Sequence, residues 1–450
     1  MTIRPALILG GLALGLVAGC AYYNGLYNAN RLVQEAEKAE REGRVGEARS
    51  YWSQAAVKAE SVVARYPDSK YRDDALLLRG RALRAAGDCA KAIDPLDAAL
   101  HTSPDTFIVR QSRLLLGQCY YQVGDYAGAV ATLTPFAESN DLSVAVTALF
   151  WRGRANLALG DYPAAAQDLA ACGLPQANLP LAVAQAKAGR PSQAERALLN
   201  NQAGRYDESA WLSVLDTVGA AFPEVATAAV DRLVRRPDLS AGERGRLLLA
   251  DGDRWLARGE PDRAAARFEQ VTITVQDSLV TQVALVQLVK AELRTTGEPL
   301  RLPALLASLS SVYLEEGLAS ELRYSALISD LELAASTLAA PETTAAPGEL
   351  TSHAGDLDLF LVAEAMRDSW DAVTLAAVLF REIPVRFPRS PIAPKAILAA
   401  AWLDVTRADS LLAVLHSEYP NSPYTLVLSG EADAEFKALE DSLRTLLNSR

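Results

Sequence analysis

The sequence predicts an all-α fold built from repeated pairs of antiparallel helices. A Gly-Asp-x-x-x-Ala motif begins at Gly87, Gly124 and Gly160, so its copies are 37 and 36 residues apart in the 450-residue chain. Each copy lies between two stretches with the apolar spacing of a helix, and strand-like alternation is almost absent. Even the β-prone segment 271–275 sits in a helical context. A motif that recurs at this period indicates stacked helix-turn-helix units.

Two glycines recur in each unit, and the sequence predicts different roles for them. The first lies seven residues before the motif, at Gly80, Gly117 and Gly153. A small residue there, or the alanine that ends the motif, lets two helices approach closely where it meets a large residue. The glycine of the motif has no Cβ, so it can adopt the left-handed conformation that ends the first helix. The aspartate after it can cap the second helix.

This pattern resembles the tetratricopeptide repeat, a helix-turn-helix unit of about 34 residues. The middle copy matches best, with signature residues at Leu116, Gly117, Tyr120, Gly124, Tyr126 and Ala129. An earlier copy begins at Gly43 and has a longer second helix. Further glycines continue the array, namely Gly189, Gly219, Gly259 and Gly297. The resemblance implies a tetratricopeptide-like solenoid with a right-handed superhelix, followed by a second, shorter helical-repeat unit.

A second motif, aromatic-Pro-x-Ser, occurs at residues 66–69, 387–390 and 419–422. Its proline stops the incoming helix, and its serine or a polar neighbour can cap the next one. The junction resembles that of periplasmic tetratricopeptide lipoproteins, such as the lipoprotein component of the β-barrel assembly machinery and the Tol–Pal-associated coordinator. That broad group shares the motif, so it indicates the class of protein and no single member.

The first twenty residues have the parts of a secretory signal. Arg4 precedes an uncharged apolar run over residues 6–17, and small residues come directly before Cys20. This run is too short to cross a bilayer, which takes roughly 20 residues. The segment that ends at Cys20 resembles the bacterial lipobox. The resemblance implies that residues 1–19 are removed and that Cys20 is acylated with several chains, which anchor stably. The alternative is an ordinary signal peptide with an unrelated cysteine.

The residues after Cys20 bear on where the anchor lies. Residue 21 is Ala21 rather than aspartate. By the sorting rule of enterobacterial lipoproteins, the resemblance implies the outer membrane, with the protein facing the periplasm. Tyr22, Tyr23 and Tyr27 either lie at the level of the lipid headgroups or pack on the first helix pair.

The chain is expected to have five segments. These are a signal peptide over residues 1–19, a lipid-anchored tether over 20–30, a tetratricopeptide-like helical array over 31–338, a linker or long loop over 339–355, and C-terminal helical pairs over 356–450. The composition of the linker, with its proline, threonine and glycine residues, is typical of a loop. An amphipathic helix over 432–447 is expected to close the last segment, because a terminal repeat needs a polar outer face.

Apart from Cys20, the chain has Cys89, Cys119 and Cys172. We expect all three to be small core residues. The alternative is a disulfide between two of them, formed in an oxidising periplasm, with one thiol left over. The three histidines of the chain are scattered and show no metal-ligand spacing, so no metal and no other cofactor is expected.

A binding groove is expected on the first helices, because repeat arrays curve and the first helix of each pair lines the concave face. Residues three or four apart share one side of a helix. This spacing gives six candidate groove residues: Arg81, Arg84, Gln118, Tyr121, Phe150 and Arg154. Arginines suit ligand carboxylates, and aromatic rings suit apolar side chains. The alternative is that the arginines pair with acids on neighbouring helices and form a solvated face.

These features predict a non-catalytic scaffold, anchored by lipid, that binds other envelope proteins or peptides in outer-membrane or cell-envelope assembly. The net charge of −11 argues against nucleic acid as a partner. One alternative is a cell-wall-remodelling enzyme or accessory factor, which would need two carboxylates that converge in a pocket. Another is a module for a small ligand or glycan, which would need an aromatic pocket in a chain with 7% aromatic residues.

Overall fold

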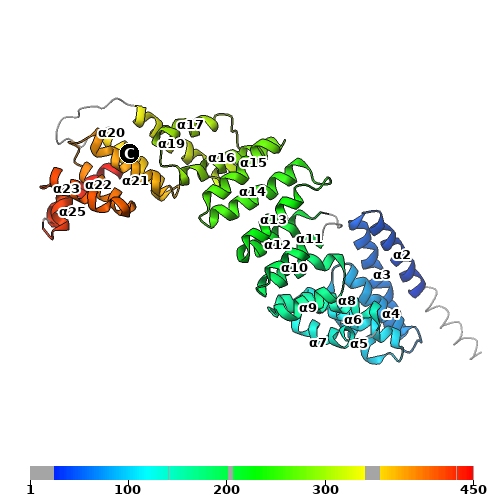
Figure 1. Ribbon diagram of the computed structural model, residues 1–450. Helices are drawn as coiled ribbons and strands as arrows, with labels where there is room; N and C mark the ends of the chain where they lie inside the picture. Colours follow the sequence, from blue (N-terminus) through cyan, green and yellow to red (C-terminus); the bar gives the residue numbers. More distant parts are fainter. Residues whose placement is uncertain (1–24, 140, 201–205, 340–354, 432, 449–450) are drawn as a thin grey trace, which may run out of the picture. The chain divides into compact units, whose positions relative to one another are not determined.

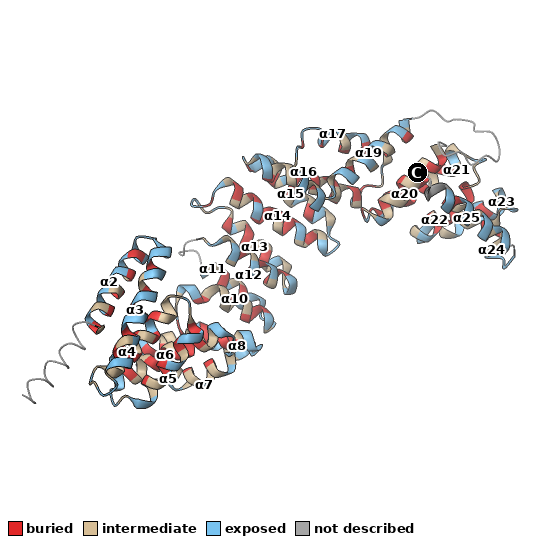
Figure 2. Cartoon of the chain, turned by 180° about the vertical axis from the view of Figure 1, so that it is seen from behind, coloured by how far each residue is buried: buried red, intermediate tan, exposed pale blue. Residues whose placement is uncertain are grey.

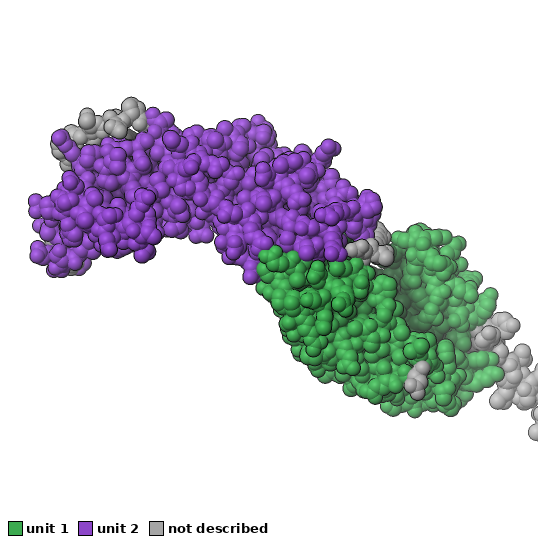
Figure 3. Space-filling model, in the orientation of Figure 1, with its two compact units in different colours: residues 1–225 green, residues 226–450 purple. Residues whose placement is uncertain are grey.

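The computed structural model describes residues 25–139, 141–200, 206–339, 355–431 and 433–448, and these residues form helices joined by turns (Figure 1). The predicted all-α repeat fold is therefore confirmed. The chain divides into two compact units, residues 1–225 and 226–450 (Figure 3). None of the described helices has the length and apolarity needed to cross a membrane. The expected signal peptide, Cys20, Tyr22, Tyr23 and most of the expected linker lie outside the described residues.

Unit 1 consists of antiparallel helix pairs. They are α2 (Tyr27–Arg41) with α3 (Val45–Arg65), α4 (Arg72–Ala85) with α5 (Cys89–Thr102), α6 (Thr106–Val123) with α7 (Tyr126–Ala137), α8 (Leu142–Leu159) with α9 (Tyr162–Ala171), and α10 (Asn178–Lys187) with α11 (Pro191–Asn200). The turn η2 (Pro175–Ala177) precedes α10, and α12 (Glu208–Ala221) packs on α10. The first helices also contact one another, α4 with α6 and α6 with α8. Buried residues lie where the helices face each other (Figure 2).

The Gly-Asp motif forms the turn of three of these pairs. Gly87, Gly124 and Gly160 have φ values of 90°, 89° and 83°, in the left-handed region that ends a first helix. The aspartate after each glycine caps the second helix of the pair. Asp125, for example, accepts a hydrogen bond from the Gly128 amide at 2.8 Å. The predicted turn and cap are therefore confirmed.

The earlier glycine of each repeat lies in close contact with the other helix of its pair. An added Cβ on Gly80, Gly117 or Gly153 would lie 2.4, 2.5 or 2.8 Å from the nearest side-chain atom of Leu96, Leu133 or Leu169, respectively. All three leucines are buried. Each leucine follows its glycine by the same interval in the sequence. The predicted contact between a small and a large residue is thus repeated in register from one pair to the next.

Gly117→Ala should destabilise unit 1 by about 1–3 kcal/mol, because the added methyl group meets Leu133 in a packed core. Gly46→Ala is the matched control. Gly46 lies in α3 with no atom within 4 Å of an added Cβ, and alanine favours the helix by up to about 1 kcal/mol. Hydrogen exchange of the α6 and α3 amides measures the two effects locally. Equal protection of α6 in Gly117→Ala and the wild type would contradict the packing account.

The second helix of the first pair is long, as the sequence predicts. Helix α3 has 21 residues, whereas α5 has 14 and α7 has 12. The extra length adds apolar surface that faces α2 and α4, and Trp52, Ala59 and Val62 of α3 are all buried there. The indole of Trp52 also donates a hydrogen bond to Glu40 of α2 at 2.7 Å. The first pair is therefore held along the whole of its longer second helix.

Two expectations from the sequence are wrong. Cys89 and Cys119 form a disulfide, with their Cα atoms 4.9 Å apart, instead of being free core residues. The reason is that α5 packs on α6, which brings the two residues together across 30 positions of sequence. Both are buried nonetheless, as is the free Cys172. Gly219 does not continue the series of turns, since it is buried inside α12, and the chain turns only at Phe222.

Unit 2 has less regular helices. Its elements are α13 (Pro223–Leu233), which begins just before the unit boundary, α14 (Ala241–Ala257), α15 (Pro261–Thr274), α16 (Ser278–Thr295), η4 (Pro299–Arg301), α17 (Leu302–Ser308), α18 (Glu316–Glu321), α19 (Tyr324–Ala339), α20 (Gly355–Asp368), α21 (Val373–Arg386), α22 (Ala393–Leu403), η5 (Val405–Arg407), α23 (Ala408–Glu418), α24 (Pro423–Leu428) and α25 (Asp433–Asn448). Residues 271–274 of the β-prone segment are helical, and Val275 follows the end of α15.

One apolar core extends from α16 to α25. It contains Leu331 of α19 and Phe360 of α20, which lie on the two sides of the expected linker in the sequence.

The aromatic-Pro-x-Ser motifs form equivalent turns within the two units. Helices α3, α21 and α23 each end directly before the aromatic residue. Ser69, Ser390 and Ser422 then accept a hydrogen bond from the amide two residues later, at 3.3, 3.2 and 3.3 Å. The predicted helix stop is therefore confirmed at all three motifs. The predicted serine cap is confirmed only for α24, whose N-cap is Ser422, since α4 and α22 begin after Tyr71 and Ile392 and have no side-chain cap. The predicted closing helix is α25, whose Leu443 is buried in the core of unit 2.

Candidate functional site

Helices α6 and α8 bring four aromatic and basic side chains together. Arg154 of α8 lies over the ring of Tyr121 of α6, with its Cζ atom 4.7 Å from the ring centroid. The same atom lies 5.6 Å from the ring centroid of Phe150 and 5.1 Å from that of Trp151. The Trp151 ring in turn contacts the rings of Tyr121 and Phe150 edge-on, with centroids 5.4 Å apart. We call these four residues the Arg154 cluster.

Helix geometry explains how the cluster forms. Phe150 and Arg154 are four residues apart on α8, so they share one side of that helix. Tyr121 lies near the end of α6, which packs on α8. Arg154 makes no ion pair with a carboxylate of the described chain, and its guanidinium is held by the three rings through cation–π contacts. A positive charge is thus fixed in place on a half-buried surface and remains available to a ligand.

The row of first helices also carries a pocket of about 260 Å³ between α2, α4 and α6. Its lining includes the exposed ring of Phe107, the amide of Gln111 and the charged side chains of Asp74 and Arg81. Asp74 is the one carboxylate among its lining residues, so the convergent pair needed by a cell-wall-remodelling enzyme is not formed there. Across the described ranges, no group of three His, Cys, Asp or Glu side chains could hold a metal ion.

The other predicted groove residues have different surroundings. Arg81 pairs with Glu37 of α2 at 2.6 Å, so it already has an acid on a neighbouring helix. Arg84 is half-buried, and its Nε atom has no hydrogen-bond partner. Burial, and next the charge of Arg81, lowers the pKa of Arg84. Gln118 is 8% exposed, which leaves it little surface for a ligand. The cluster therefore contains Tyr121, Phe150 and Arg154 but none of these three residues.

Two further residues of these sites, Trp151 in the Arg154 cluster and Phe107 in the pocket, are not among the six residues predicted from the sequence. Trp151 lies three residues before Arg154, and Phe107 lies four residues before Gln111. Helical spacing therefore indicates that each shares a side of its helix with a site residue. The spacing of residues along α8 cannot predict that Trp151 contacts the ring of Tyr121, because Tyr121 lies on another helix, α6. Only the packing of α6 on α8 shows that Trp151 completes the cluster.

Asp74→Asn should stabilise unit 1 at neutral pH and lose this advantage in acid. Burial, followed by repulsion from Asp105 and Asp73, raises the pKa of Asp74. A carboxyl with a higher pKa in the folded state than in the unfolded chain favours folding when protonated, and its ionisation costs stability. The melting temperature of the variant should exceed that of the wild type at pH 7. The two should converge as the pH falls below about 3.9. A constant difference would contradict this account.

The stacked antiparallel pairs, their turn glycines and their repeated glycine–leucine contacts define an all-α helical-repeat protein. Residues 33–105 and 114–173 match the family model of the tetratricopeptide repeat. This region is therefore built of tetratricopeptide repeats. Such repeats typically form non-catalytic scaffolds for interactions between proteins.

Solved structures resemble the chain at low sequence identity. A tetratricopeptide repeat protein from Parabacteroides merdae is 17% identical, covers 58% of this chain and 99% of its own, and gives a TM-score of 0.35. The C-terminal part of a tetratricopeptide repeat-containing protein from Cytophaga hutchinsonii is 11% identical, covers 62% of this chain and 99% of its own, and gives a TM-score of 0.34. None of the curated protein sequences matches the chain.

Proposed function

We propose that the chain is a lipid-anchored, non-catalytic scaffold that faces the periplasm from the outer membrane and binds segments of other envelope proteins. The tetratricopeptide repeats support the scaffold role. The lipobox-like sequence that ends at Cys20 supports the anchor. The disulfide between Cys89 and Cys119 supports an oxidising compartment, because disulfides persist in the periplasm and are rare in the cytosol.

The Arg154 cluster is the observation that carries the binding role. The planar guanidinium of Arg154 can donate two parallel hydrogen bonds to a ligand carboxylate. Tyr121, Phe150 and Trp151 offer apolar surface beside this charge. A peptide segment with one acidic and one apolar residue matches both features. The pocket between α2, α4 and α6 adds Phe107 as a further apolar contact on the same row of first helices.

Arg154→Glu should reduce the capture of partner proteins at least tenfold. The full-length precursor is produced in a Gram-negative host, crosslinked in its envelope and purified, and the bound proteins are quantified by mass spectrometry. Charge reversal replaces attraction of a ligand carboxylate by repulsion. Arg49→Glu is the matched control, because Arg49 is exposed on the second helix α3. Arg49→Glu should keep the melting temperature of the wild type. Arg154→Glu loses its cation–π contacts, so circular dichroism is used to confirm that it remains folded.

The lipid anchor is tested separately, by labelling and fractionation of the same envelopes. Cys20→Ala should abolish incorporation of radiolabelled palmitate and move the protein from the membrane fraction to the soluble fraction. Label retained in Cys20→Ala would refute acylation of Cys20, and label that separates with the inner membrane would refute the proposed location. Recovery of the same proteins at the same yield from Arg154→Glu and the wild type would refute the binding role of the cluster.

A further inference from the structure

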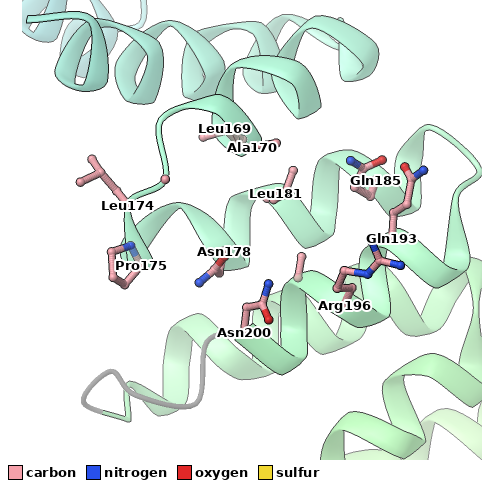
Figure 4. A pocket seen from close by; sticks show the side chains of 12 residues that line it. Leu169, Ala170, Leu174, Pro175, Asn178, Leu181, Gln185, Gln193, Arg196 and Asn200 are labelled. Carbon is pink, nitrogen blue, oxygen red and sulfur yellow. The ribbon is translucent and has the colours of Figure 1, made fainter. Parts of the chain in front are cut away.

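A crevice of about 660 Å³ lies on a different part of unit 1, between the second helices α9 and α11 and above α10 (Figure 4). Its polar lining consists of Asn178 and Gln185 from α10 and Gln193, Arg196 and Asn200 from α11. The Arg154 cluster, in contrast, lies on the first helices α6 and α8. The crevice is therefore a separate site, and it shares no residue with the proposed groove.

The polar residues are ordered along the crevice by helical spacing. Asn178 and Gln185 are seven residues apart on α10, and Gln193 and Asn200 are seven residues apart on α11, so each pair lies on one side of its helix. Because the two helices are antiparallel, Asn178 lies near Asn200 at one end, and Gln185 lies near Gln193 at the other (Figure 4). Arg196 lies between the ends. Seven residues of helix span about 10 Å, which is the length of about three residues of extended peptide.

Among the described residues, which leave out residues 201–205 directly after Asn200, this lining has few hydrogen-bond partners. In the described residues, the side chains of Asn178, Gln193, Arg196 and Asn200 make no hydrogen bond or ion pair. Gln185 is 9% exposed, and its buried Oε1 atom has no hydrogen-bond partner. This atom is shielded from the crevice, so the amides that a ligand can reach there are those of Asn178, Gln193 and Asn200.

The chemistry of the lining selects the ligand class. Each carboxamide has both a donor and an acceptor, which complements the N–H and C=O of a peptide backbone. Arg196 is the one charged residue on the lining, so it selects a carboxylate. Leu169 and Leu181 provide apolar contacts. The lining contains no aromatic ring on which a saccharide could stack, which favours a peptide over a glycan.

We propose that this crevice binds an extended, acidic peptide segment of a protein partner. The carboxamides at its two ends hold the peptide backbone, and Arg196 pairs with an aspartate or glutamate side chain between them. This site goes beyond the proposed function, because a chain with two separate binding surfaces on one unit can join two partners. It does not depend on whether the Arg154 cluster binds a ligand.

The test uses a phage-displayed library of random heptapeptides selected on the immobilised full-length protein. Selected sequences should be enriched in Asp and Glu. A synthetic peptide from the selection, titrated by calorimetry, should bind Arg196→Glu at least tenfold more weakly than the wild type, and Arg196→Lys should keep part of the affinity. Arg190→Glu is the matched control, because Arg190 is exposed at the start of α11 and outside the lining. It should bind like the wild type, as should Arg154→Glu.

Three results would overturn the proposal. They are selected peptides without acidic enrichment, equal affinity of the wild type and Arg196→Glu, and binding of chitotetraose that Arg196→Glu or Gln185→Leu removes. The last result would reassign the crevice to a saccharide. Since Arg154→Glu is measured in parallel, loss of peptide binding in that variant alone would assign the peptide to the first-helix surface and also overturn the proposal for the crevice. Circular dichroism of each variant confirms that it is folded.

Discussion

Asp251→Ala should lower the local free energy of unfolding of unit 2 by about 3–5 kcal/mol, the cost of removing one partner from a buried ion pair. Asp251 of α14 is 1% exposed. Its carboxylate pairs with Arg254 at 3.0 Å and with Arg267 at 2.9 Å, and it accepts a hydrogen bond from Thr227 at 3.0 Å. Alanine would leave both guanidinium groups without this carboxylate in a region with little water.

The effect is measured by native-state hydrogen exchange of the α14 amides, which reports the stability of this part of unit 2 separately. Asp262→Ala is the matched control, because Asp262 is an exposed aspartate in the first turn of α15. Its removal should cost no more than about 1 kcal/mol. A loss below about 1 kcal/mol for Asp251→Ala would show that the ion pairs do not hold α13, α14 and α15 together.

Unit 1 contains a comparable buried carboxylate. Asp168 of α9 is 3% exposed and accepts hydrogen bonds from Arg152 of α8 at 2.7 and 2.8 Å. Asn156 of α8 donates a third hydrogen bond to it at 3.2 Å. In each unit, an aspartate in the interior is thus neutralised by arginine from the same or an adjacent helix. Such pairs hold neighbouring helices in register because removing one partner leaves a buried charge with fewer interactions.

Replacing both Cys89 and Cys119 by alanine should lower the local stability of unit 1 by about 2–4 kcal/mol. The disulfide closes a loop across 30 positions of sequence and so restricts the unfolded chain. It joins α5 to α6, the second helix of one pair and the first helix of the next. Hydrogen exchange of the amides in these two helices gives the loss. Reduction of the wild type with dithiothreitol should produce a loss of the same size.

Cys172→Ala is the matched control for this experiment, because Cys172 is buried but free. The difference in local stability between Cys172→Ala and the wild type should be the same with and without dithiothreitol. If reduction leaves the protection of α5 and α6 unchanged in the wild type, the disulfide does not form. The proposed periplasmic location would then lose one of its supports, and only the sequence around Cys20 would remain in its favour.

The sequence predicts the repeat unit because its determinants are local. A turn glycine and a capping aspartate act within one turn of backbone, so the motif at Gly124 indicates both the end of α6 and the start of α7. The contact between Gly117 and Leu133 joins the two helices of one pair, and the spacing of the motif already implies it. Where the motif weakens, as at Gly219, the prediction fails, since a buried glycine within a helix has the same sequence signal as a turn glycine.

The candidate sites depend on longer-range packing. Arg154 meets Tyr121 because α6 packs on α8, and Arg81 meets Glu37 because α4 lies near α2. Helical spacing predicts the side of the helix on which each residue lies but not its partner on another helix.

Local sequence patterns are enough to predict the helical pairs, their turns, the aspartate caps and three members of the Arg154 cluster. These features depend on backbone conformation and on neighbours within one or two turns of a helix. Packing between helices, in contrast, pairs Cys89 with Cys119, gives Arg154 aromatic rather than acidic neighbours, and forms the crevice lined with amides along α9, α10 and α11. Each of these depends on which helices pack together, and the periodicity of a single helix does not contain that information.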